Sequence, residues 1–409
     1  MHVRLPLVLM LLTSACATVP ESEAFNAPAD RISRFELKER CAQVAYTPDR
    51  ASGPRFVSYE IASAAWTPPP PVPLAPPHRP DILSTPEPVL GTTGDPKVDA
   101  YRDRILNSYD SQHGWRPYLR RLFAGLCADG TILTAAETEP RSFAAAVDRY
   151  LTPGRIAEGR RLYRELSGRP PFTGEAKVPL DVLLAMWAVT SDYGRDLPRY
   201  DMIQAQLVRG AYDQLSYPEA FEIYEAAAII LSGKVERATS LAYADGRIGQ
   251  LRLLPSNYEQ WARDGDGDGR SDIWHNRADI LKTFNDMMSG TWEPGMPILV
   301  EIEPLRLNMN DPAQARLARG IGSGQGIKAE YFKRVDGQPW PSETWGGKPI
   351  TPFGPSGPTF LLTSNETPVN VMSPFRAKWG DWKGQELAVA VGLLADAIAG
   401  RPGPTRPIR

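Results

Sequence analysis

The chain has 409 residues, of which 42% are hydrophobic, and this length and composition are enough for a sizeable core in two or three domains. Its 46 Lys and Arg residues nearly balance its 48 Asp and Glu residues, which gives a formal net charge of -2. Such a balance provides no electrostatic basis for binding nucleic acid, so we exclude that class of partner.

Residues 1–15 have the layout of a cleaved export signal. Arg4 supplies a positive charge, residues 5–12 are almost entirely apolar, and small residues precede Cys16. The apolar run is too short to span a bilayer as a helix. Small residues before a cysteine resemble the bacterial lipoprotein processing site, which implies acylation of Cys16, and Ala17 favours the periplasmic face of the outer membrane. The alternative is an ordinary signal peptide that contains a cysteine.

Two cysteines remain once Cys16 is assigned to the lipid anchor. They are Cys41 and Cys127, and an exported protein works in an oxidising compartment where a disulfide persists. The sequence leaves two alternatives open, which are one disulfide between this pair or two buried free thiols.

Proline marks the boundary between the N-terminal segment and the main domain. The chain contains 40 prolines, and ten of them lie between Pro68 and Pro88. A run of this kind forms neither helix nor central strand and behaves as an extended spacer. We therefore expect five segments, which are a signal peptide at 1–15, a lipid-anchored segment at 16–66, a spacer at 67–96, a main domain at 97–400 and a Pro-rich tail at 401–409.

The main domain has helical periodicity from about residue 97 onward. Apolar residues recur at spacings of three and four in several windows, and turn residues dominate between 320 and 358. The pattern predicts a mainly α (α+β) fold with a small irregular or β subdomain near the C-terminus. The predicted helical windows are residues 118–126, 143–166, 178–189, 220–231 and 385–398.

Three aspartates alternate with glycines in the most specific local motif. Asp264, Asp266 and Asp268 occupy positions 1, 3 and 5 of a calcium-type loop, and the carbonyl of Arg270 falls at position 7. Position 12 is a histidine, a poor calcium ligand, so Asp279 on the following helix is the better closing carboxylate. We expect a structural Ca²⁺ here, and the alternative is an Asp/Gly-rich turn without a cation.

The loop and its flanks resemble the membrane-bound lytic murein transglycosylase B family. The resemblance implies a lysozyme-like helical domain that carries an EF-hand-type calcium loop, and it extends over residues 97–400. The segments that carry it are LPSNY (254–258), WARDGDGDGRSDIW (261–274), Asp279 and TWEPGMPILVE (291–301), with RSF (141–143), Tyr150, RIAEG (155–159), VPL (178–180) and AMW (185–187) upstream and GPTFLL (357–362) and AVAVGLLADAIAG (388–400) downstream.

The resemblance also implies a reaction, which is cleavage of the bond between N-acetylmuramic acid and N-acetylglucosamine to a 1,6-anhydro product. One glutamic acid performs both proton transfers in this family, and its pKa must be raised for that task. The family motif, approximately Gly-Val-Glu-Thr/Ser-x-aromatic-Gly, aligns with residues 188–194, where Thr190 takes the place of the glutamate. A threonine hydroxyl has no ionisation near neutral pH, so no catalytic residue is assigned.

Further departures from the family fall at the same site. The resemblance aligns Tyr243, Arg252 and Trp382 with polar groups that contact the sugar, so these three are the candidate substrate-binding residues. Asp192 lies two residues after Thr190, about 200° around a helix, and points away from that position unless the helix has ended.

These observations favour a non-catalytic, peptidoglycan-associated outer-membrane lipoprotein that acts in murein binding or cell-wall remodelling, alone or with a cell-wall enzyme as partner. The alternative is an active lytic transglycosylase with a relocated acid, for which Glu222, Glu225 and Asp245 are the residues to inspect. A glycosidase that uses water would need two carboxylates at a defined separation, and no sequence feature selects such a pair.

Overall fold

The structure of the protein is a computed structural model. It describes residues 83–84, 86–108, 114–134, 140, 142–168, 170–212, 221–323, 326–341, 345–350, 357–366, 369, 384–406 and 408. The predicted export signal, Cys16, Cys41, most of the Pro-rich spacer and Trp382 lie outside the described residues.

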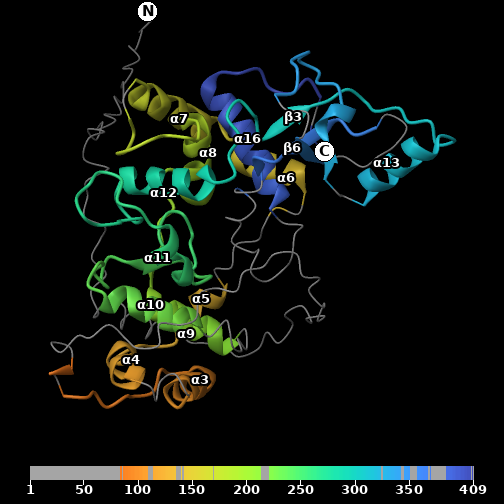
Figure 1. The fold of residues 1–409 in the computed structure, drawn as a ribbon. Coiled ribbons are helices and arrows are strands. Elements are labelled where there is room, and N and C mark those ends of the chain that lie inside the picture. Colours follow the sequence, from red (N-terminus) through yellow and green to blue (C-terminus); the bar gives the residue numbers. More distant parts are fainter. Residues whose placement is uncertain are drawn as a thin grey trace, which may run out of the picture.

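The described chain is mainly helical, as the periodicity predicts (Figure 1). Its helices are α3 (Pro96–Leu106), α4 (Arg116–Phe123), α5 (Thr131–Thr134), α6 (Phe143–Tyr150), α7 (Pro153–Leu166), α8 (Leu180–Ser191), α9 (Met202–Tyr212), α10 (Phe221–Leu231), α11 (Tyr258–Trp261), α12 (Arg277–Ser289), α13 (Pro312–Gly322) and α16 (Gln385–Ala399), with short 3-10 turns η2 (Pro255–Asn257) and η3 (Ala329–Tyr331).

Two small antiparallel sheets accompany the helices. Strands β1 (Tyr200–Asp201) and β2 (Leu241–Ala242) form a two-stranded pair. The larger sheet has the order β3-β6-β5-β4, formed by Leu299–Glu301, Phe360–Thr363, Gly346–Pro349 and Ile327–Lys328. This sheet is the predicted small β subdomain near the C-terminus.

Local capping residues explain where the helices start and stop. The predicted helical window at 143–166 is divided because Thr152 caps α7 through its side chain and Pro153 occupies the first helical turn. Proline has no N–H to donate to a preceding turn, so a continuous helix cannot pass through this point. At the other end of the domain, Gly400 ends α16 with a left-handed backbone at φ 72°.

Helices α8 and α16 form the centre of the main hydrophobic core. Ten of the twelve residues of α8 are buried, and its fully buried side chains include Leu183, Leu184 and Trp187. Figure 1 shows α16 beside α8, with α7 and α12 nearby and α9 and α10 toward the other end of the molecule. Because α8 is almost entirely enclosed, its last turn is held in a fixed position, and that turn carries Thr190.

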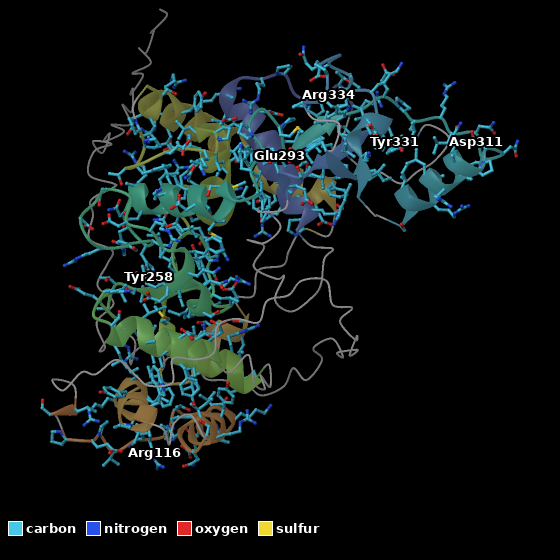
Figure 2. All side chains as sticks on the ribbon, viewed as in Figure 1. Arg116, Tyr258, Glu293, Asp311, Tyr331 and Arg334 are labelled. Carbon is cyan, nitrogen blue, oxygen red and sulfur yellow. The ribbon has the colours of Figure 1, made fainter. Side chains whose placement is uncertain are left out.

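A second, smaller core belongs to the larger sheet and α13. It gathers apolar side chains that include Phe332, Trp345 and Leu361. Figure 2 shows Tyr331 and Arg334 in this part of the molecule, away from Tyr258, which lies near the calcium-type loop. The second core therefore belongs to a subdomain beside the main helical body.

Cys127 is disulfide-bonded. Its backbone carbonyl also accepts a hydrogen bond from the side-chain amide of Gln204 at 2.9 Å, which attaches this segment to α9. Of the two alternatives for the thiols, the free-thiol state does not apply to Cys127.

Among the described residues, no helix combines the length and the apolar composition that a membrane span requires.

Candidate functional site

Thr190 lies in the last turn of α8, at the position where the resemblance places a catalytic glutamate. Its side-chain hydroxyl donates to the carbonyl of Met186 at 3.0 Å and also lies 3.3 Å from the carbonyl of Trp187. Only 7% of the residue is exposed. The hydroxyl is therefore bonded back onto its own helix, and it supplies no titratable group to the site.

Asp192 does not replace the missing acid. It ends α8 in a left-handed conformation at φ 50°, and Tyr193 follows at φ 57°. The Asp192 carboxylate accepts a hydrogen bond from Nε of Arg155 at 2.9 Å, in an ion pair with α7. The helix has ended at this residue, and its carboxylate is engaged by a cation of the neighbouring helix.

Tyr243 and Arg252, two of the predicted substrate-binding residues, lie in direct contact with each other. The guanidinium carbon of Arg252 is 3.9 Å from the centre of the Tyr243 ring, and each residue is 7% exposed. Arg252 Nε donates to the backbone carbonyl of Thr190 at 2.8 Å, and Nη2 pairs with Asp196 at 2.9 Å. The Tyr243 hydroxyl donates to the carbonyl of Asp196 at 2.6 Å.

Gln250 fixes the other side of the α8 terminus. Its side-chain oxygen accepts from the indole N–H of Trp187 at 2.6 Å and from the Ser191 hydroxyl at 3.3 Å, and its amide donates to the carbonyl of Trp274 at 2.6 Å. Gly194 has φ 84°, and a Cβ there would lie 2.8 Å from the Gln250 oxygen. The turn after α8 therefore packs closely against the segment that carries Arg252.

Three other acids were candidates for a relocated catalytic group. Glu222 accepts from both the backbone N–H and the hydroxyl of Ser256, at 3.0 and 2.7 Å, and burial raises its pKa. Asp245 accepts from the backbone N–H of Arg247 at 3.1 Å. Burial, followed by the negative charges of Glu222 and Glu259, raises the pKa of Glu225 to about 7. The pKa of Glu225 therefore lies near neutrality, where a proton-transfer group works.

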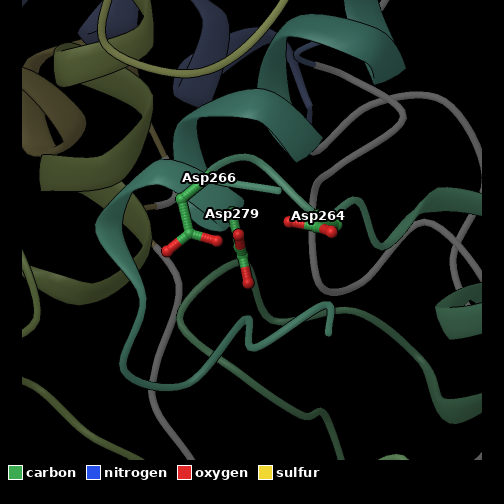
Figure 3. A group of neighbouring side chains, drawn as sticks. All are labelled: Asp264, Asp266 and Asp279. Carbon is green, nitrogen blue, oxygen red and sulfur yellow. The ribbon is translucent and has the colours of Figure 1, made fainter. Parts of the chain in front are cut away.

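The structure brings three of the predicted metal ligands together. Carboxylate oxygens of Asp264, Asp266 and Asp279 lie within 4.8 Å of one another. Figure 3 shows the Asp279 side chain between those of the other two. Asp264 also accepts backbone N–H groups of Gly267 and Gly269, at 2.6 and 2.7 Å, which wraps the loop around its carboxylate.

Asp279 closes the loop from α12. Its two oxygens accept the backbone N–H groups of Gly265 and Asp272, at 2.7 and 2.6 Å. Burial raises the pKa of Asp279 to about 6, and the facing carboxylates of Asp264 and Asp266 contribute to that rise. Hard carboxylate oxygens gathered in this way are the donor set that Ca²⁺ prefers. The residues present therefore fit a calcium ion.

The Asp268 carboxylate lies on the same loop but outside this group, and the predicted carbonyl ligand of Arg270 follows it two residues later. The Asp268 carboxylate accepts the backbone N–H of Arg270 at 2.8 Å, and both residues are exposed. His275, at position 12, lies 3.5 Å from the Asp272 carboxylate.

Two residues of the site were missed by the sequence reasoning. Asp196 and Gln250 make the contacts that connect the α8 terminus to the 243–252 segment, and neither belongs to a motif of the chain. They lie 56 and 59 residues from the partners they bind, so no local pattern in the sequence identifies these pairs.

Comparison with known proteins gives the family. The family model for the transglycosylase SLT domain matches residues 99–370. SltB3 from Pseudomonas aeruginosa, solved in complex with NAG-anhNAM-pentapeptide, is similar with 22% identity and a TM-score of 0.57 over 76% of this chain and 82% of that chain.

Two further solved structures share the fold. SltB1 from Pseudomonas aeruginosa has 17% identity and a TM-score of 0.55 over 75% of this chain and 99% of that chain. Slt35 from Escherichia coli, solved in complex with calcium, has 15% identity and a TM-score of 0.56 over 76% of this chain and 96% of that chain. The curated proteins include no match. Because the family model covers more than half of the 409 residues, the chain belongs to the SLT-domain family of lysozyme-like lytic murein transglycosylases.

Proposed function

We propose that this chain is a non-catalytic, peptidoglycan-associated lipoprotein of the lytic murein transglycosylase B type, held at the periplasmic face of the outer membrane through Cys16. The observation that carries the proposal is the hydrogen bond from the Thr190 hydroxyl to the Met186 carbonyl, in place of a carboxyl group. A group that cannot ionise near neutral pH can neither protonate a leaving oxygen nor act as a base.

The neighbouring contacts support the same conclusion. Asp192 is paired with Arg155, and Arg252 attaches a positive charge to the backbone of Thr190 itself. A general acid in this place would need a raised pKa, and a guanidinium beside it would lower that pKa. Murein binding or the positioning of a partner enzyme on murein are the roles left to a transglycosylase fold without its acid.

The test is an incubation of purified protein that lacks Cys16 with intact murein sacculi, followed by mass analysis of the released material. Co-sedimentation with sacculi and no soluble product is the expected outcome. Release of anhydro-muropeptides well above a buffer control would show that the chain is an active enzyme. A variant of an active family member with Gln at its glutamate position, assayed in parallel, sets the level of background release.

Glu225 favours one alternative, an active transglycosylase with a relocated acid. Its pKa of about 7 suits an acid that gives up and recovers a proton at neutral pH. The sacculi assay separates the two readings when Glu225→Gln is included with the matched control Glu236→Gln, an exposed carboxylate beyond the end of the same helix. Product that disappears only in Glu225→Gln would establish the alternative, and an absence of product in all three proteins supports the non-catalytic role.

We also propose that the loop of Asp264, Asp266 and Asp279 binds a structural Ca²⁺. The support is the convergence of three carboxylates within 4.8 Å, together with the calcium complex of Slt35 from Escherichia coli. A cation that binds only the folded state stabilises it, so a chelator is expected to lower the Tm of calcium-loaded protein. An unchanged Tm would leave the loop as a turn without a metal, and Asp266→Asn gives a matched variant with a weaker chelator response.

A further inference from the structure

Three groups among the described residues surround the Arg252 side chain. The Tyr243 ring covers one face of its guanidinium at 3.9 Å, the Thr190 carbonyl accepts its Nε at 2.8 Å, and the Asp196 carboxylate pairs with Nη2 at 2.9 Å. The residue is 7% exposed. A buried cation that is stacked, hydrogen-bonded and ion-paired in this way is fixed in one geometry.

The groups around Arg252 are fixed as well. The Tyr243 hydroxyl donates to the backbone carbonyl of Asp196 at 2.6 Å, so the ring and the guanidinium are both attached to the same residue of the loop after α8. Arg247 donates to the carbonyl of Arg252 at 3.0 Å and is equally buried. The contacts form a closed circuit from the end of α8, through the loop at Asp196, to the 243–252 segment.

We propose that Arg252, held by Tyr243 and Asp196, is an internal plug beside Thr190. It fills the place where the resemblance to the family expects sugar contacts, here called the sugar cleft, and keeps glycan out of it. The proposal rests on the assignment of Thr190 to the family's glutamate position. It also goes beyond the missing acid, because it makes the cleft itself unavailable and assigns any murein contact to other surfaces or to a partner. Tyr243 and Arg252 then act as the occupants of the cleft rather than as groups that contact a sugar.

The plug and the missing acid are chemically coupled. Arg252 Nε lies 2.8 Å from the backbone carbonyl of residue 190, so a carboxylate introduced at that residue would have a fixed guanidinium as a neighbour. Such a pair stabilises the ionised carboxylate and lowers its pKa, which is the opposite of what a general acid requires. A buried ion pair would then tie up the group that has to transfer the proton.

Binding of a muropeptide tests the plug directly. The probe is NAG-anhNAM-pentapeptide, titrated into protein without Cys16 and followed by calorimetry and by the indole N–H resonance of Trp187, which reports on the α8 terminus through its bond to Gln250. The variant pair is Tyr243→Ser and Arg252→Gln together, which replaces the ring and the cation by smaller neutral polar side chains. Arg195→Gln is the control, because it removes an exposed cation of the same loop, 3.7 Å from Glu158, without touching the plug.

The wild-type protein and Arg195→Gln are expected to leave the Trp187 resonance unmoved, with a Kd weaker than about 1 mM, while the double variant gains at least about tenfold in affinity. The plug is wrong if the muropeptide shifts the Trp187 resonance of the wild-type protein and binds that protein as tightly as it binds the double variant. If the double variant loses its cooperative melting transition, Arg252→Gln alone is titrated, and a folded Arg252→Gln without a gain in affinity also overturns the proposal.

The outcomes keep the plug and the proposed function apart. Wild-type binding in the cleft without release of anhydro-products from sacculi would refute the plug and leave the non-catalytic assignment standing. Release of anhydro-products by the wild-type protein would refute the non-catalytic assignment. A gain of binding in the variants with no product from any of the proteins supports both.

Discussion

Glu225 gives the chain a stability that depends on pH in a direction that the structure fixes. Its carboxyl on α10 has no hydrogen-bond or ion-pair partner among the described residues, and burial with two nearby carboxylates raises its pKa to about 7 from the ordinary 4.5. A folded-state pKa above the unfolded value means that the folded protein holds the proton more tightly. The contribution to stability is therefore full below about pH 4.5 and is lost as the pH rises through 7.

The magnitude follows from the pKa difference. The rise of this pKa from 4.5 to about 7 corresponds to roughly 3 kcal/mol, at about 1.36 kcal/mol for each pKa unit. Because Glu225 is only partly buried, solvent screening reduces this figure, and we expect about 1–2 kcal/mol. Replacement by Gln removes the charge but keeps the shape, so Glu225→Gln should be more stable than wild type at pH 8 and equal to it near pH 4.5.

Thermal melting of wild type and Glu225→Gln at several pH values between 4.5 and 8 checks this expectation. For a domain of this size the gain at pH 8 amounts to about 2–5 °C in Tm. Glu236→Gln, which removes an exposed carboxylate beyond the end of α10, should change Tm by the same small amount at every pH. The burial argument is refuted if the gain in Tm of Glu225→Gln does not vary with pH, or if its Tm at pH 8 is lower than that of wild type.

Three further predictions concern the α8 terminus, the loop and the C-terminal tail. Thr190→Glu alone should release no anhydro-product from sacculi, since Arg252 would hold the new carboxylate ionised, and product at the level of an active family member would contradict this. Gly265→Ala places a Cβ 2.1 Å from a backbone carbonyl oxygen of α12. We expect it to lower the free energy of unfolding by about 1–3 kcal/mol and to reduce the effect of a chelator on Tm. Gly290→Ala, with open space around its Cβ, should leave both quantities unchanged. Arg401→Met leaves the buried Asp181 carboxylate without its cation and should lower the free energy of unfolding by about 1–3 kcal/mol, measured with denaturant. The double variant Arg401→Met with Asp181→Asn should recover most of this loss.

The helices of the domain follow from short-range rules in the sequence. The window at 385–398 predicts α16 to within one residue at its C-terminus, because Gly400 and the prolines after it leave no other place to stop. The window at 143–166 indicates helix throughout, and only the Thr152 cap with Pro153 reveals that two helices share it. Period and capping therefore locate helices well when the stop signal is a single strong residue.

The larger sheet was predictable only as a region. Its strands have two to four residues each, and β5 contains two glycines and a proline, which are unfavourable in strands. The pairing of β3 with β6 joins residues about 60 positions apart, so it depends on the packing of the second core rather than on a local pattern. Composition alone therefore gave the position of the subdomain without its strand order.

In the candidate site, the spacing of residues in the sequence predicts some contacts and not others. Asp264 and Asp266 converge because their spacing fixes a loop, and Asp279 joins them from the first turn of α12. The contact of Arg252 with Asp196 has no such local cause, since both residues depend on how the 243–252 segment packs on the α8 terminus. Sequence comparison marked Arg252 as a departure, and only the structure shows which groups surround it.

Backbone strain around Thr190 gives a last test of how this terminus is held. Asp192, Tyr193 and Arg252 are the non-glycine residues with positive φ in the described part of the chain, and all three adjoin the end of α8. Left-handed backbone costs roughly 1–2 kcal/mol for most residues, and Asp and Asn tolerate it best. Asp192→Asn removes only a partly exposed ion pair with Arg155 and should cost about 0.5–1 kcal/mol.

Asp192→Ala removes the same ion pair and adds the full left-handed penalty, so it should cost about 1–2 kcal/mol more than Asp192→Asn in denaturant unfolding. Equal losses of unfolding free energy in the two variants would mean that the backbone at residue 192 relaxes and that its left-handed strain is not maintained. A larger loss in Ala would show that the contacts of α7 and the 243–252 segment hold the α8 terminus in one strained geometry. Packing would then fix the shape of this terminus whatever residue stands at position 190.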